Sequence, residues 1–266
     1  MKNILSNIVK SESEIRLIKE SSLLVGKTLA EVARFIKPGV TTKFLDEIAE
    51  TFIRDNNGVP SFKGYSGFPA SLCISVNDHV VHGIPGNNIL KDGDIVSVDC
   101  GVKMNGYHGD YAYTFLIGNV KPEVVELVKA TKESLYEGIK VAIAGNTTGD
   151  IGYAIQSYVE SRGYSVVREL VGHGIGKSLH EKPNVPNYGQ KGTGYRLKSG
   201  MVICIEPMIN LGKKTIIFEN DGWTVRTVDG LPSAHFEHQI VVRENQAEIL
   251  STYEYIEQII NKQING

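Results

Sequence analysis

The first regular hydrophobic spacing in the chain begins just after residue 11. Ser11 and Glu14 have the spacing of a capping box, in which each side chain bonds the other residue's backbone N–H. The apolar positions that follow recur every three or four residues and predict an amphipathic helix, with an inward face of Ile15, Ile18, Val25, Leu29, Val32 and Ile36. Pro38-Gly39 ends this helix. A second helix is predicted from Thr42, with Leu45, Ile48, Ala49 and Phe52 facing inward.

The later half of the chain repeats this order of elements. Pro122 suits the first turn of a helix, whose apolar face is Leu127, Val128, Leu135 and Ile139. The next helix carries Ile151, Ile155, Tyr158 and Val159, and Gly163 closes it. Gly39-Val-Thr-Thr42 matches Gly145-Asn-Thr-Thr148, and Leu90-Lys-Asp-Gly93 matches Leu197-Lys-Ser-Gly200 at nearly the same separation. Chance similarity of common turns is the alternative.

No Pro/Gly/Ser-rich linker separates the two halves, so they are expected to share one core. The prediction is a single domain over residues 1–266, with internal pseudo-repeats at about 12–118 and 122–243.

Four acidic residues occupy strand-like segments in which an acid is unusual. Asp99 ends the apolar run 94–99, and Glu206 ends the apolar run 201–206. Asp110 opens a segment whose aromatic residues alternate onto the opposite face, and Glu237 stands at the head of the segment 237–242. Four different strands are therefore predicted to offer one carboxylate each.

These carboxylates, together with His173 in a glycine-rich stretch, favour a site for two metal ions. Several buried carboxylates close together either bind protons or require a positive partner. Two divalent cations would balance the four negative charges. For any one of these acids alone, an exposed position at the end of a strand is an equally good interpretation.

Composition narrows the class of protein further. The chain has 266 residues, of which 41% are hydrophobic, enough for a sizeable core. With 28 basic and 30 acidic residues, no excess of charge favours DNA, RNA or a membrane surface as a partner. Cys73, Cys100 and Cys204 form no CxxC pair, which argues against a disulfide framework. The first residues lack a signal-peptide pattern, so a cytoplasmic location is expected.

Several motifs resemble the signature stretches of type I methionine aminopeptidases, in the short bacterial form. They are Asn77-Asp-His-Val-Val-His-Gly-Ile-Pro85, Val98-Asp-Cys-Gly101, Tyr107-His-Gly-Asp110, Gly172-His-Gly-Ile-Gly176 with His180-Glu181, Ile205-Glu-Pro-Met208 and Phe236-Glu-His-Gln-Ile240. The resemblance implies an α/β (α+β) "pita-bread" fold of the creatinase/aminopeptidase type. In that fold a pseudo-twofold, curved and mostly antiparallel sheet carries helices on its outer face. It also implies removal of the initiator methionine from new proteins when the second residue is small.

The resemblance assigns roles to seven residues. Asp99, Asp110, His173, Glu206 and Glu237 would bind two divalent metal ions, and Glu206 would also be the acid/base. A carboxylate beside a metal-activated water can handle the proton of that water as it attacks the peptide carbonyl. His180 would serve the developing oxyanion and His82 the scissile amide. The donor set suits Co, Mn, Fe(II) or Zn and does not choose among them.

The same resemblance implies an apolar specificity pocket for the methionine side chain, since sulfur packs well against aromatic edges. Its expected walls are Tyr65, Phe68, Cys73 and Trp223. Phe62 and Leu179 depart from the cysteine and phenylalanine that are frequent in the family. Each wall residue alone would be ordinary in a packed loop or at a hairpin.

The expected partner is a peptide or nascent-protein N-terminus that begins with methionine. Transient association with the ribosome and a monomeric state are also expected, with no DNA or membrane as a partner.

Two other functions are alternatives for a chain with this fold and these ligand positions. A proline-specific relative, such as an Xaa-Pro aminopeptidase or prolidase, uses the same five ligands but usually has an additional N-terminal domain. A non-catalytic binding protein of the same fold usually has a broken ligand set, whereas all five positions are present here.

Overall fold

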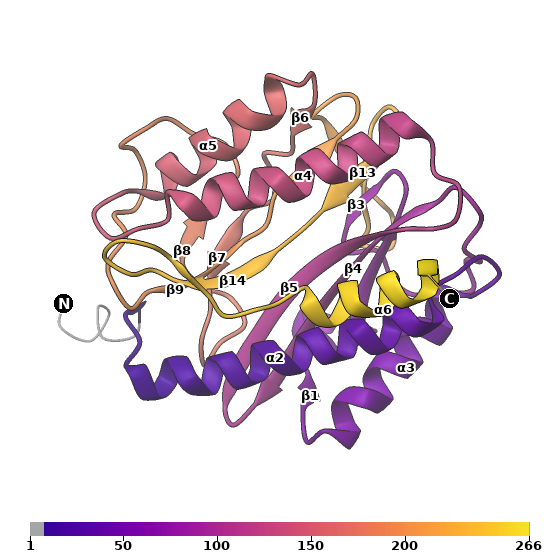
Figure 1. The fold of residues 1–266 in the computed structure, drawn as a ribbon, viewed down its shortest axis with the longest axis horizontal. Helices are drawn as coiled ribbons and strands as arrows, with labels where there is room; N and C mark the ends of the chain where they lie inside the picture. Colours follow the sequence, from indigo (N-terminus) through magenta and orange to yellow (C-terminus); the bar gives the residue numbers. More distant parts are fainter. Residues whose placement is uncertain (1–7, 266) are drawn as a thin grey trace.

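The computed structural model describes residues 8–265. Its helices lie on two sides of a central layer of strands (Figure 1). Those of the first half and the C-terminus lie on one side: α2 (Glu12–Phe35), α3 (Thr42–Asp55) and α6 (Glu254–Asn265). On the other side lie α4 (Pro122–Lys140) and α5 (Thr148–Glu160). None of the described helices is long and apolar enough to cross a membrane.

The helices begin where the sequence predicts. Ser11 is the N-cap of α2 with a complete capping box, Pro122 occupies the first turn of α4, and α5 has a second capping box built from Thr147 and Asp150. Three predicted inward positions differ. Ile36 lies just beyond α2 in an extended conformation, because Pro38 disfavours further helix. Ile48 and Phe52 of α3 are only half-buried, beside the groove between α2 and α3.

Two sheets form most of the central layer, and every strand pair in them is antiparallel. The first contains a short edge strand and a long hairpin: β1 (Val59–Pro60), β2 (Leu72–Val76), β4 (Ile95–Met104) and β5 (Tyr107–Leu116). The second has the order β15-β14-β9-β7-β8, from β7 (Gly172–Gly174), β8 (Glu181–Val185), β9 (Val202–Ile205), β14 (His238–Val241) and β15 (Glu248–Ile249).

Two smaller sheets flank them. One pairs β13 (Ser233–His235), β10 (Met208–Asn210) and β6 (Ser165–Val166), and the other pairs β11 (Ile216–Phe218), β12 (Val225–Thr227) and β3 (His79–Val81). A 3₁₀ turn at Tyr65–Gly67 lies in the connection from β1 to β2. One main apolar cluster joins the inner faces of the helices to the strands, so both halves of the chain contribute to it.

The structure corrects the predicted positions of the acidic residues along their strands. Asp99 and Asp110 lie in the middle of ten-residue strands rather than at a strand end or opening, and Glu237 immediately precedes β14. The long hairpin packs closely on α2, because a Cβ on Gly109 would lie 2.3 Å from the backbone N of Ser22. Gly109 thus lets the helix support β5 directly beside Asp110.

Candidate metal centre

The hairpin of β4 and β5 brings two of the predicted ligands together. Asp99 pairs with Ala112, and Gly101 pairs with Asp110, so the two aspartates are diagonal neighbours on one face of the ladder. Asp110 is buried and Asp99 half-buried. Regular antiparallel pairing alone therefore places these two carboxylates side by side.

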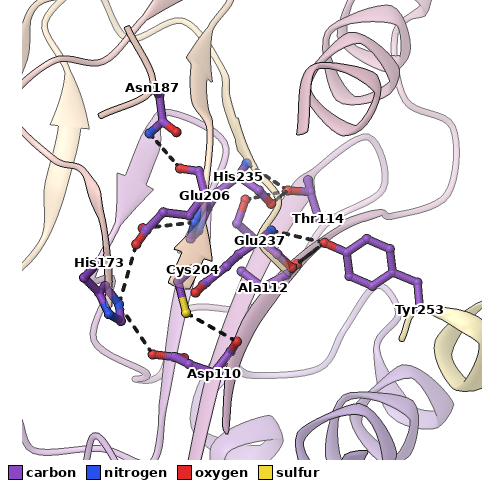
Figure 2. A network of polar contacts seen from close by, with 11 residues as sticks. Asp110, Ala112, Thr114, His173, Asn187, Cys204, Glu206, His235, Glu237 and Tyr253 are labelled. Atoms are coloured by element: carbon purple, nitrogen blue, oxygen red, sulfur yellow. Dashed lines mark hydrogen bonds and ion pairs between the residues drawn. The ribbon is translucent and has the colours of Figure 1, made fainter. Parts of the chain in front are cut away.

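The second sheet supplies the other three predicted ligands. His173 is on β7, Glu206 directly follows β9, and Glu237 directly precedes β14, whose His238 pairs with Ile205. His173 Nε2 lies 3.9 Å from Asp110 Oδ2 and 3.7 Å from Glu206 Oε1. Figure 2 shows His173 reaching toward both carboxylates. Ligand atoms of Asp99, Asp110 and Glu237 lie within 4.8 Å of one another.

Burial dominates the electrostatics of these carboxylates. It raises the pKa of Asp110, Glu206 and Glu237 well above the usual range, and neighbouring carboxylates raise each pKa further. Burial also raises the pKa of Asp99 to about 6, although His235 partly opposes this. Without a cation, the cluster therefore favours bound protons at a pH where isolated carboxyls are ionised.

The buried polar atoms of the cluster fit a divalent cation. Asp99 Oδ1, Asp110 Oδ1 and Glu237 Oε1 are buried and have no hydrogen-bond partner within residues 8–265. Such atoms are uncommon in folded proteins, where a bound ion or water usually satisfies them. Carboxylate oxygens with one imidazole are a donor set suited to first-row divalent metals, and burial lowers the pKa of His173 to about 3, which keeps it neutral.

His235 and His238 are both buried. His235 Nε2 lies 3.6 Å from Glu206 Oε2, and Glu206, His235 and Glu237 form another group able to hold a metal. Asn187 also reaches the centre, donating from Nδ2 to the backbone O of Glu206 at 2.9 Å (Figure 2). No local pattern distinguishes these residues from ordinary buried polar ones.

The two other predicted catalytic histidines, His180 and His82, line a cavity beside the carboxylates. The rings of His180 and His173 are 4.3 Å apart and edge to face, and His180 Nδ1 lies 2.8 Å from the Tyr65 hydroxyl. Burial lowers the pKa of His180, and it lowers the pKa of His82 to about 4. Both imidazoles are therefore neutral near pH 7, and His82 adopts a left-handed backbone conformation with φ 58°.

The cavity beside the carboxylates has a volume of about 540 Å³. All the predicted pocket residues line it: Phe62, Tyr65, Phe68, Cys73, His82, His180 and Trp223. Phe68 and Trp223 meet edge to face with ring centres 5.1 Å apart. Phe62 packs against β4, because a Cβ on Gly101 would lie 2.7 Å from its ring. The cavity thus has an aromatic region and an acidic region.

Comparison with known proteins gives consistent results along the chain. Residues 16–244 match the model of metallopeptidase family M24. The chain is 50% identical over 244 residues to methionine aminopeptidase 1 of Bacillus subtilis, with 92% of this chain and 98% of that protein covered. The crystal structure of methionine aminopeptidase from Rickettsia prowazekii is similar with a TM-score of 0.90 at 42% identity, covering 92% of this chain and 99% of that one.

A more distant structure has the same fold. The X-Pro aminopeptidase from Thermotoga maritima has a TM-score of 0.76 at 21% identity, covering 94% of this chain but 64% of that one. At this level of identity, the likeness concerns the fold alone. Together these similarities confirm the predicted pita-bread fold class.

The first testable prediction concerns pH and metal. In the metal-free fold, raised carboxyl pKa values give a contribution to stability that is present at low pH and is lost as the pH rises, through about 6 for Asp99. Cations require the deprotonated carboxylates. The difference in thermal midpoint between Mn²⁺-loaded and EDTA-treated protein should therefore increase from about pH 5 to about pH 8.

Differential scanning fluorimetry at constant free Mn²⁺ measures this difference, and other titrating groups largely cancel because they are common to both samples. Glu237→Gln, which removes one ligand charge with little change in volume, is the control and should reduce the difference. A midpoint difference that stays constant over this pH range would contradict the interpretation of the cluster.

Proposed function

This chain belongs to metallopeptidase family M24, and from that membership we propose that it is a metal-dependent aminopeptidase that removes N-terminal methionine. The observation that carries the proposal is the convergence of four carboxylates and one imidazole at one end of an aromatic cavity. Its curated relatives at about this chain's length are named methionine aminopeptidases.

Membership of the family implies binding of divalent metal. We propose that Asp99, Asp110, His173, Glu206 and Glu237 hold two ions, drawn from Mn, Fe(II), Co or Zn. When bound, such ions lower the pKa of water toward neutrality and polarise a carbonyl oxygen. Their charge also stabilises the ionised carboxylates, whose pKa values burial raises in the metal-free fold.

Glu206 is the proposed proton carrier for the reaction. It is half-buried at the end of β9, and its two carboxylate oxygens face His173 and His235 at 3.7 and 3.6 Å. With cations bound, its carboxylate would stay ionised, so it can accept a proton from the attacking water and return it to the leaving amine. Asn187 fixes its backbone, which orients the side chain for both transfers.

His180 and His82 are proposed to orient the substrate. When the Tyr65 hydroxyl donates to Nδ1 of His180, the ring proton of this neutral imidazole lies on Nε2. That N–H can donate to the carbonyl oxygen as negative charge develops there. His82 lines the same cavity, 6.4 Å ring to ring from Trp223, and its proposed role is to contact the scissile amide.

The aromatic region of the cavity is the proposed methionine pocket. An unbranched thioether fits between aromatic edges such as those of Phe68 and Trp223. Phe62 and Tyr65 also line this cavity. The ring of Phe62 packs directly against Gly101 of β4. We propose that it narrows the cavity and helps exclude substrates with a bulky residue after the methionine.

We also propose that the substrate is a nascent protein, met in the cytoplasm by a monomeric enzyme that associates transiently with the ribosome. Support for these points comes from the functional assignment, because removal of an initiator methionine acts on newly made chains. The formal net charge of −2 offers no electrostatic basis for binding DNA or a membrane.

Substrate preference separates this function from that of a proline-specific relative. Purified protein with Mn²⁺ should hydrolyse Met-Ala-Ser with a far higher kcat/KM than an Xaa-Pro peptide, and a Met-peptide with a large second residue should be poor. Release of free methionine, measured by chromatography, checks this. Preference for the Xaa-Pro substrate would overturn the assignment, and absence of any Mn²⁺ binding would favour a non-catalytic protein.

The role of Glu206 makes a separate prediction. Glu206→Ala should lower kcat by about a hundredfold or more without unfolding the domain, because it removes the proton carrier and one proposed ligand. Glu206→Gln, which keeps the shape but not the basicity, should be similarly slow. Steady-state assays at saturating Mn²⁺ measure both, and near-normal turnover of either variant would contradict this role.

For His180, substitution by alanine should lower kcat by about a hundredfold if Nε2 stabilises the oxyanion. His79→Ala is the matched control, since His79 is on β3 and is not among the residues that line the cavity. Assays on Met-Ala-Ser under the same conditions compare the two. An unchanged rate for His180→Ala would make this histidine a structural residue.

A further inference from the structure

The metal centre lies across a joint between the two large sheets. Asp99 and Asp110 belong to the sheet of β4 and β5, whereas His173, Glu206 and Glu237 belong to the sheet of β9 and β14. Within residues 8–265, β5 forms a regular ladder only with β4. The distance between carboxylates on opposite sides of the joint therefore depends on the contacts that hold β5 against β14.

One backbone hydrogen bond crosses this joint, from the N–H of Glu237 to the O of Ala112 at 3.1 Å, and side chains make the other contacts. Thr114 Oγ1 donates to the backbone O of His235 at 2.6 Å and accepts from its N–H at 3.0 Å. Gln239 Oε1 accepts the N–H of Asp110 at 3.3 Å, and its Nε2 donates to the O of His108 at 3.3 Å. Each of these contacts gives a buried backbone N–H or C=O the hydrogen-bond partner that a ladder would otherwise supply.

Tyr253 makes the central contact between the two sheets. Its hydroxyl oxygen lies 2.7 Å from the backbone O of Glu237 and 2.9 Å from the O of Ala112, so its one hydrogen is shared between these acceptors, and the oxygen accepts the N–H of Glu237 at 3.1 Å. Figure 2 shows the hydroxyl of Tyr253 reaching both backbones. Ala112 pairs with Asp99 and lies two residues from Asp110, so one phenol links the backbones that carry three proposed ligands.

Packing fixes the ring of Tyr253 in place. The residue is 4% exposed, its ring stacks on His238 at 4.0 Å, and it meets Tyr113 edge to face at 5.0 Å. Ser251, two residues earlier, accepts the N–H of Gln239 at 3.1 Å. Residues 250–253, between β15 and α6, thus contact His238 and Gln239 of β14 and Glu237, which immediately precedes this strand. This segment lies beyond residues 16–244, which carry the family match.

We propose that Tyr253 is a positioning residue of the metal centre, which fixes the backbone of Glu237 against Ala112 and so sets the separation of the carboxylates across the joint. The inference rests on the proposed function for the identity of the ligands. The hydroxyl of Tyr253 bonds backbone atoms, and Tyr253 is not among the residues that line the cavity, so its effect is on the geometry and affinity of the cation site. Backbone placement matters because ligand orientation strongly affects metal affinity.

Titration calorimetry of Mn²⁺ into the metal-free full-length protein tests this proposal. Tyr253→Phe keeps the stacked ring and removes only the hydroxyl, and it should weaken Mn²⁺ binding by about tenfold or more. Amide hydrogen exchange at Glu237 in the metal-free protein should also accelerate, because its N–H loses the phenol oxygen and keeps the O of Ala112 as its acceptor.

Tyr111→Phe is the matched control. Its buried hydroxyl donates to the backbone O of Thr252 at 2.9 Å, so it ties down the same segment without contacting the backbone of Glu237. Both variants should lose similar unfolding free energy in EDTA, but Tyr111→Phe should bind Mn²⁺ within about twofold of wild type. Equal Mn²⁺ affinity of the two variants would overturn the proposal and leave Tyr253 a purely stabilising residue.

Ser251→Ala provides an independent variant if Tyr253→Phe fails to fold. It removes the acceptor for Gln239, whose side chain holds the N–H of Asp110, so Mn²⁺ binding should weaken while the fold is retained. Unchanged affinity in this folded variant would overturn the inference. Inactivity of wild-type protein on Met-Ala-Ser would contradict the proposed function instead, so the two failures are distinguishable.

Discussion

Mutual repulsion among buried carboxylates is the constraint on which the site depends. Four acids converge beside one neutral imidazole, and burial raises the pKa of each acid. In a medium of low effective dielectric, such a set is stable only with protons or cations among its oxygens. Within residues 8–265, three carboxylate oxygens of this cluster have no hydrogen-bond partner, so this part of the chain leaves these groups unsatisfied. The fold therefore supplies a preformed place for positive charge.

The acids converge because the fold brings together two sheets, one from the first half of the chain and one from the second. The hairpin of β4 and β5 aligns two aspartates through regular pairing, while β7, β9 and β14 supply the remaining residues. Helices on both sides cover these strands (Figure 1), and Asp110 and Glu237 are buried. The joint itself is held by one backbone hydrogen bond, from Glu237 to Ala112, and by side chains such as Thr114 and Tyr253, which makes it sensitive to single hydrogen bonds.

The proposed metal ligands and the proposed pocket residues lie on different kinds of structural element. The proposed metal ligands are on or beside strands, where backbone pairing limits their movement, whereas Tyr65, Phe68 and Trp223 come from connections between strands. Tyr65 links the two regions, because its hydroxyl bonds His180 at the edge of the carboxylate cluster. Backbone pairing thus holds the proposed ligands, while residues from connections form the wall of the cavity.

Local sequence determined the helices, since capping residues and apolar spacing act within a few positions. It also singled out the acids and His173 as members of one site, because acids are rare in buried strands. Only the tertiary structure placed Asp99 and Asp110 in mid-strand, His235 beside Glu206, and Tyr253 on the backbone of Glu237. Those placements depend on how two sheets pack, and contacts between distant segments leave no periodic pattern in the residues that make them.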